Sequence, residues 1–148
     1  MSELRKFLFE GLPVRGMLVR LTESWQDLLE RRAQAESGAY PEPVRKLLGE
    51  MAAAAVLMQS NIKFNGALIL QMQGDGPVRL AVAEVQPDLS FRATATLQGA
   101  VPHGARLEAL LNVQGQGRCA ITLDPKDRLP GQQPYQGVVP LHGDQREP

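Results

Sequence analysis

The residue types that most often bind metals or attack substrates are few in this chain and widely spaced. It has one cysteine, Cys119, and two histidines, His103 and His142, with no CxxC or HxxxH spacing. A reactive thiol needs a basic, exposed setting. Cys119 instead has apolar strand neighbours, and the adjacent Arg118 should point to the other face of that strand. We therefore interpret Cys119 as a small buried hydrophobic residue and expect no metal site.

Two glycine-rich stretches, Gly74-Asp75-Gly76-Pro77 and Gly115-Gln116-Gly117, are candidates for phosphate-binding loops. A P-loop requires Lys-Ser or Lys-Thr after its glycines, at the start of a helix. Here proline follows the first stretch, and a strand pattern follows both. The sequence favours ordinary turns at both places, so we expect no cofactor-binding residues.

Acid–base or nucleophilic catalysis would have to use Asp75, Asp124, Asp127, the serines or the histidines. No GxSxG elbow is present, and no local pattern singles out any of these residues. We expect no catalytic residues, and a small-molecule hydrolase is kept only as an alternative.

The methionines have two interpretations. They would either form an adaptable apolar binding surface or fill the core, and core filling is favoured. The four residues concerned are Met17, Met51, Met58 and Met72. The Arg31-Arg32 pair is most simply a solvated helix face.

The element most informative about the fold is a helix expected over about residues 43–60. Pro43 suits its first position, and the run Met51-Ala52-Ala53-Ala54-Ala55-Val56-Leu57-Met58 is apolar on every side. A helix that is apolar all round should be buried all round. The sequence therefore predicts a central helix with sheet on both of its sides.

The remaining elements are mostly strands. Val14 to Leu21 suits a strand in which Gly16 marks a bulge or a close contact, and a helix with Ser24 as N-cap should follow and end by Gly38. Three strands between residues 67 and 97 predict an antiparallel meander, with one or two helical turns near Leu107 to Leu111. Two more strands are expected over residues 118–123 and 135–139, and Pro140 implies that the last one either lies at a sheet edge or ends there. The sequence predicts an α+β class: antiparallel sheets packed around a buried alanine-rich helix (β/α/β layers), with smaller flanking helices.

Length and composition exclude several classes of protein. The chain has 148 residues, 43% hydrophobic and 22% charged, which is typical of one soluble globular domain. Sixteen basic residues balance sixteen acidic residues, so nothing indicates a nucleic-acid partner, and self-association is electrostatically permitted. The longest apolar run is too short for a bilayer span and no signal peptide is seen, so we expect a cytoplasmic protein without membrane contact.

Several spaced segments form a recognisable pattern: Phe64-Asn65-Gly66, the stretch from Leu70 to Val78, and Tyr135-Gln136-Gly137-Val138-Val139, together with Phe9, Val14 to Val19, and Tyr40 to Val44. Together they resemble the redox-regulated heat shock protein 33 family of bacterial chaperones. The resemblance covers nearly the whole chain. It implies a cytoplasmic, ATP-independent holdase that binds unfolding proteins under oxidative stress.

The resemblance also implies a linker and a C-terminal switch in which four cysteines hold zinc. None of those cysteines is present, and Cys119 matches none of them. We therefore expect residues 1–148 to be an N-terminal core fragment, truncated before the end of the core, the linker and the switch, without zinc or redox control.

The functional hypothesis is a non-enzymatic holdase whose partners are unfolded client proteins, with homodimers possible. The alternative from another class is a passive assembly module that only docks the missing half of the protein.

Overall fold

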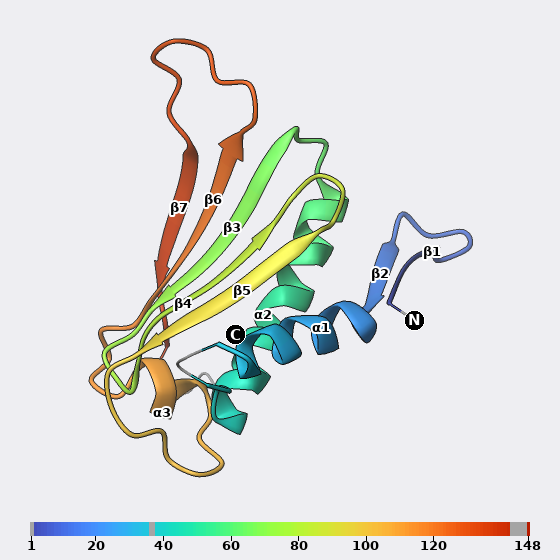
Figure 1. Cartoon of the computed structure of the whole chain (residues 1–148). Helices are drawn as coiled ribbons and strands as arrows, with labels where there is room; N and C mark the ends of the chain where they lie inside the picture. The colour runs from blue at the N-terminus through green and yellow to red at the C-terminus, as the bar shows by residue number, and fades with distance from the viewer. Residues whose placement is uncertain (1, 36–37, 143–147) are drawn as a thin grey trace. The chain divides into compact units, whose positions relative to one another are not determined.

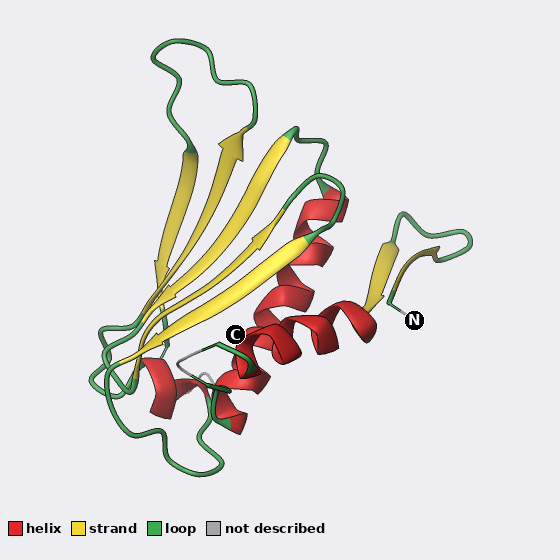
Figure 2. Cartoon of the chain, viewed as in Figure 1, coloured by secondary structure: helices red, strands yellow, loops and turns green. Residues whose placement is uncertain are grey.

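The computed structural model describes residues 2–35, 38–142 and 148. Its helices and strands belong to two compact units, Met1–Ala39 and Tyr40–Pro148. Figure 2 shows the helices in red, the strands in yellow and the loops and turns in green.

The first unit is a β-hairpin followed by a helix. Strands β1 (Glu3–Leu8) and β2 (Arg15–Arg20) pair antiparallel, and α1 (Glu23–Ala33) follows. β2 was predicted, but β1 was not. The expected close contact at Gly16 is confirmed, because a side chain there would overlap the ring of Phe7.

The prediction that Ser24 caps this helix is wrong. The N-cap is Thr22, whose backbone N–H donates to the Ser2 Oγ at 3.0 Å, and Ser24 lies inside α1. Ser2, the residue before β1, thus bonds the backbone N–H of the residue that caps α1.

The second unit contains a five-stranded antiparallel sheet in the order β5-β4-β3-β6-β7 (Figure 1). The predicted meander is confirmed, and so is the edge position of the last strand. The strands are β3 (Gly66–Gln73), β4 (Val78–Val85), β5 (Phe91–Leu97), β6 (Arg118–Pro125) and β7 (Tyr135–Pro140).

The long helix α2 (Glu42–Asn61) packs along β3, β4 and β5. The side chains that it buries recur at helical spacing: Val44, Leu47, Leu48, Met51, Ala52, Ala55 and Val56. They meet the buried strand residues Leu68, Leu70 and Met72 of β3 and Ala81, Ala83 and Val85 of β4. Burial of these apolar side chains is the main stabilising contribution to the unit.

Burial of α2 on every side, the expectation drawn from its alanines, is wrong. Ala53, Ala54, Leu57 and Met58 are only partly buried. Alanine is the best helix former and has a short side chain, so a run of alanines is also tolerated where a helix is partly exposed. Two antiparallel sheets with a helix packed on one of them confirm the α+β class, and a second layer of strands on α2 stays a prediction.

A local irregularity changes which residues of β4 face the helix. The pairing of β4 with β5 shifts between Val78 and Leu80. Val78 is buried, but beyond the shift Ala81 and Ala83 are buried while Leu80 and Val82 are partly exposed. A strict period of two cannot predict this switch, because a bulge adds one residue to the alternation.

Candidate functional site: the open half of the sheet

The face of the sheet that carries α2 has a covered half and an uncovered half. α2 lies along β3, β4 and β5, and β6 and β7 continue the sheet beyond it (Figure 1). We call the uncovered set the open half; its members are Cys119, Ile121 and Leu123 of β6 and Tyr135 and Val139 of β7.

Strand register places these five residues on the same face as the core. Leu68, Leu70 and Met72 of β3 stand opposite Leu123, Ile121 and Cys119 of β6. In turn, Leu123 stands opposite Tyr135, and Cys119 opposite Val139. Directly opposed residues share a face, so the apolar surface buried under α2 continues onto the open half.

The open half becomes more exposed toward the edge of the sheet. Cys119, Ile121 and Leu123 are partly buried, whereas Tyr135 is 81% and Val139 58% exposed. A contiguous apolar surface of this kind marks an interaction site more often than isolated exposed hydrophobic residues do.

The outer edge of β7 presents unpaired backbone groups. The Leu141 N–H donates to the Gly117 carbonyl at 2.9 Å, which fixes the alternation of the β6–β7 ladder. Tyr135, Gly137 and Val139 therefore bond to β6, and Gln136 and Val138 direct their N–H and C=O groups away from the sheet. Within the described part of the chain, no strand pairs with this edge.

The opposite edge, β5, is protected. The Ala95 N–H points outward there and donates to the Tyr40 hydroxyl oxygen at 3.0 Å. The same hydroxyl lies 3.3 Å from the Thr94 Oγ1. α2 also packs on β5, so this edge is partly covered by a helix and one outward amide is already bonded.

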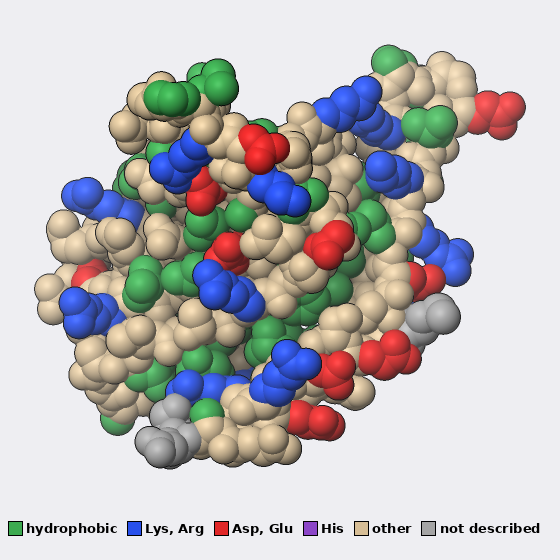
Figure 3. All heavy atoms as spheres, turned by 45° about the horizontal axis from the view of Figure 1, so that its top comes forward, with side chains coloured by type: hydrophobic (Ala, Val, Ile, Leu, Met, Phe, Trp, Pro, Cys, Tyr) green, Lys and Arg blue, Asp and Glu red, His purple; other side chains and the backbone are tan. Residues whose placement is uncertain are grey.

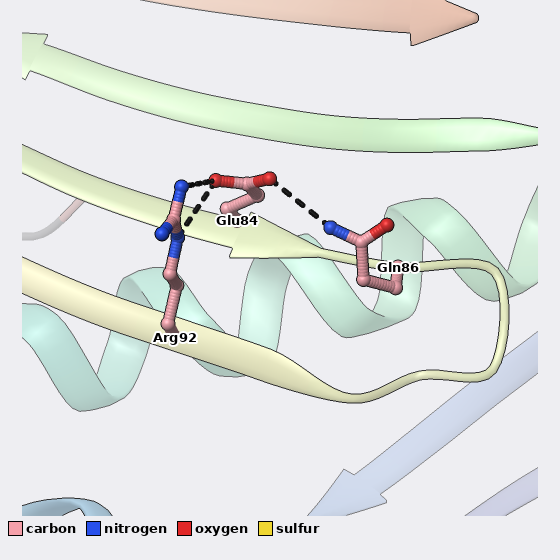
Figure 4. Close-up of polar contacts among 3 residues, drawn as sticks. All are labelled: Glu84, Gln86 and Arg92. Carbon is pink, nitrogen blue, oxygen red and sulfur yellow. Dashed lines mark hydrogen bonds and ion pairs between the residues drawn. The ribbon is translucent and has the colours of Figure 1, made fainter. Parts of the chain in front are cut away.

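An ion pair next to this edge adds charge to β5. Arg92 donates from its Nε to Glu84 Oε2 at 2.8 Å, and the Gln86 amide donates to Glu84 Oε1 at 3.0 Å (Figure 4). Charged side chains on edge strands oppose pairing with other chains. β7, whose sequence is YQGVVP, carries no charge.

The other face of the sheet is mixed in character. Ile69, Leu80 and Val82 are partly buried there, beside the exposed Val138. On the side of the molecule seen in Figure 3, hydrophobic side chains lie between Lys, Arg, Asp and Glu side chains. The open half is distinguished from this face by its continuity with the core.

Cys119 is the one cysteine of the chain and is free. Burial raises the pKa of its thiol above the usual value. A raised pKa lowers the thiolate fraction, and the thiolate is the form that reacts with oxidants and binds metals. Among the described residues, no group of three or more His, Cys, Asp or Glu is placed where it could hold a metal ion.

The glycine-rich stretches are turns, as expected. Asp75 Oδ2 accepts the backbone N–H groups of Gln114 and Gln116 at 3.0 and 2.8 Å, so it holds the second stretch against the first. A side chain at Gly74 would overlap the Val78 carbonyl. The glycines therefore serve close packing beside α3 (Leu107–Leu111).

The other candidate residues are dispersed. Met51 and Met72 lie in the core, while Met17 and Met58 are partly buried, so core filling is confirmed for two of the four methionines. The remaining candidates lie on separate elements: Arg31 and Arg32 in the last turn of α1, His103 in the loop after β5, Asp124 on β6 beside Arg128, and Asp127 and His142 in exposed connections.

Sequence reasoning did not identify the open half as a site. The signal was present in residues 134–140, Pro-Tyr-Gln-Gly-Val-Val-Pro, an uncharged strand between two prolines. Natural edge strands usually carry a charge or a bulge, so an uncharged edge is itself informative.

No helix in the described ranges is long and apolar enough to span a bilayer.

Comparison with known proteins gives a consistent answer. The family model described as Hsp33 protein matches residues 2–147. The 33 kDa chaperonin of Chromobacterium violaceum is 49% identical over 143 residues, which cover 97% of this chain and 45% of that protein. The 33 kDa chaperonin of Methylobacillus flagellatus is 42% identical over 143 residues, which cover 96% of this chain and 44% of that protein.

A solved structure shares the fold. The 33 kDa chaperonin (heat shock protein 33 homolog) of Thermotoga maritima superposes with a TM-score of 0.70 at 20% identity and covers 95% of this chain and 46% of its own. The chain thus spans less than half the length of the relatives that it matches. By the match of the family model over nearly its whole length, this chain belongs to the Hsp33 family.

Proposed function

We propose that this chain is a holdase: it binds unfolding proteins through the open half of the sheet and prevents their aggregation without ATP. The observation that carries the proposal is the apolar surface that continues from the core onto β6 and β7, ending in Tyr135 and Val139. The names of the relatives, 33 kDa chaperonin, support the same class of function.

The physical basis is the burial of apolar surface. Unfolding proteins expose apolar side chains, and burial contributes about 25 cal/mol for each Å² removed from water. An uncharged apolar sheet surface accepts many sequences, because hydrophobic contact is not directional. Such a surface suits a partner without fixed structure.

The proposal includes no cofactor, no catalysis and no redox control within these residues. The raised pKa of the partly buried Cys119 thiol supports this view, since it disfavours the reactive thiolate. The balanced net charge supports a protein partner over a nucleic acid. We place the protein in the cytoplasm and the chain as the N-terminal core of a longer chaperone, with homodimers as a possible assembly.

The test is light scattering of malate dehydrogenase at its unfolding temperature, with and without this chain. We expect suppression that is unchanged by ATP or peroxide. The double variant Tyr135→Thr/Val139→Thr should suppress less well. Leu129→Thr is the matched control, because Leu129 is 73% exposed but lies outside the strands.

Three results would count against the proposal. Absence of suppression by the unmodified chain would leave a passive assembly module as the better description. Equal loss in the control variant would show that the open half is not the binding surface. Activation by peroxide alone would reveal redox control that Cys119 is not expected to supply.

A further inference from the structure

We propose that the outer edge of β7 binds a client segment as an added antiparallel or parallel strand, so that main-chain hydrogen bonds supplement the apolar contacts. This inference rests on the proposed function and deepens it, since it names the conformation of the bound client. The occupant is an extended, uncharged stretch of an unfolded polypeptide.

The backbone geometry of β7 defines what this edge offers. Gln136 and Val138 direct both N–H and C=O outward, as the ladder to β6 requires. Pro140 also faces outward by the same alternation, and it has no N–H to donate. Pro134 stands directly before the strand and lacks an N–H as well. The prolines thus limit the outward donors of this edge to two amides.

The chemistry of these groups selects a strand as partner. Outward N–H and C=O groups at alternate residues match the backbone of an extended chain and no other common ligand. All six residues of β7 are exposed, and none is charged. An uncharged segment therefore meets no repulsion and loses no ionic hydration at this edge.

The position of β7 also allows an added strand to contact the apolar face of the sheet. Alternate side chains of an added strand would point to the face that holds Tyr135 and Val139, and would extend the open half by one strand. A bound segment would thus gain main-chain hydrogen bonds at the edge and apolar contacts at the face.

A second copy of this chain fits less well. Two β7 strands paired antiparallel about Gly137 would join Gln136 of one copy to Val138 of the other, with four hydrogen bonds. The next outward pair would be Pro134 opposite Pro140, which has no donor on either side. A flexible client segment is not restricted to this register and need not place a proline opposite Pro134 or Pro140.

The experiment compares Val138→Pro with Val138→Thr in the malate dehydrogenase assay. Proline removes one outward amide but no bond to β6, whereas threonine keeps the amide and changes the side chain. We expect Val138→Pro to raise the concentration needed for half-suppression by about fivefold, the effect of losing one net hydrogen bond. Val138→Thr changes the side chain at the same place, so the further loss in Val138→Pro relative to Val138→Thr measures the contribution of the outward amide.

A second measurement does not depend on whether the proline variant folds. A fluorescent, uncharged nine-residue peptide of alternating valine and threonine is titrated with the unmodified chain. The same peptide with every core amide N-methylated is the control. We expect binding of the first peptide and at least a tenfold weaker affinity for the second.

The outcomes separate the two proposals. If the unmodified chain suppresses aggregation but neither Val138→Pro nor N-methylation weakens binding, the edge inference is overturned and the holdase proposal stands. If the unmodified chain does not suppress aggregation, both fail. If sedimentation shows a dimer that Val138→Pro dissociates, the edge pairs with a second copy and the client inference is overturned.

Discussion

The two edge strands of the five-stranded sheet differ in whether their outward backbone groups have hydrogen-bond partners. On β5, the Ala95 N–H donates to the Tyr40 hydroxyl, and the Arg92–Glu84 ion pair places charge next to the edge. On β7, no described strand pairs with the outward groups of Gln136 and Val138, and the strand carries no charge. A single sheet thus has one protected edge and one edge open to pairing.

The two halves of the helix-bearing face show the same contrast. β3 and β4 bury their inward residues under α2, while β6 and β7 expose theirs progressively. The buried apolar contacts and the exposed apolar surface thus lie on different strands. Under the proposed function, the protected half holds the fold together and the open half exchanges partners without unfolding.

The largest expected difference between the halves concerns stability. Leu68→Ala removes a side chain that is 2% exposed and should lower the free energy of unfolding by about 2–5 kcal/mol. Val139→Ala, on the open half, should lower it by less than about 0.5 kcal/mol. Urea unfolding followed by circular dichroism measures both. Similar losses for the two variants would show that β7 belongs to the core.

Removal of a single oxygen atom should leave the protected edge, β5, with an unbonded amide. Tyr40→Phe deletes the acceptor of the Ala95 N–H and should lower the free energy of unfolding by about 1 kcal/mol. It should also increase self-association, because a second edge then has an unpaired amide. Urea unfolding and sedimentation velocity measure the two effects. Unchanged values in both would mean that the hydroxyl does not protect β5.

A smaller effect is expected from the ion pair of Figure 4. The Arg92 side chain is 80% exposed, so Arg92→Ala should change the free energy of unfolding by less than about 1 kcal/mol. A double-mutant cycle with Glu84→Gln isolates the pair, and its coupling should shrink in 1 M salt. A coupling energy above about 2 kcal/mol that resists salt would contradict this role as an exposed edge charge.

The smallest effect is expected at Cys119, and it depends on pH. Because burial raises the thiol pKa, the thiolate fraction at pH 8 is lower than that of a free cysteine. Alkylation by iodoacetamide should therefore be slower than that of glutathione at pH 8, and the rate should reach half its maximum at a higher pH. Mass spectrometry follows the reaction. A rate above that of glutathione would reopen a redox role for this residue.

Much of the fold could be predicted from the sequence because the patterns were local. The alternation in residues 91–97 and the apolar run of α2 correspond to observed elements. Strand β1 was not predicted, because nothing in its own residues indicates that it pairs with β2. The predicted N-cap of α1, Ser24, was wrong. The N-cap is Thr22, and its amide is bonded by Ser2, twenty residues away.

The open half could not be predicted because exposure is a tertiary property. Cys119, Ile121 and Leu123 read as an inward strand face, and they do share the face of the core. Whether a helix covers them depends on the path of α2 across the sheet. The uncharged edge was visible in residues 135–139, but that it lies uncovered followed only from the structure.

Amide hydrogen exchange by NMR, residue by residue, tests the difference between the two edges most directly. In the free chain the amides of Gln136 and Val138 should exchange fast, and those of Gly137 and Val139, bonded to β6, should exchange slowly. Reduced, carboxymethylated α-lactalbumin, a permanently unfolded chain, should protect Gln136 and Val138 and leave the Ala93 amide on β5 unchanged. Protection on β5 instead, or no protection on β7 under conditions in which aggregation is suppressed, would contradict the account.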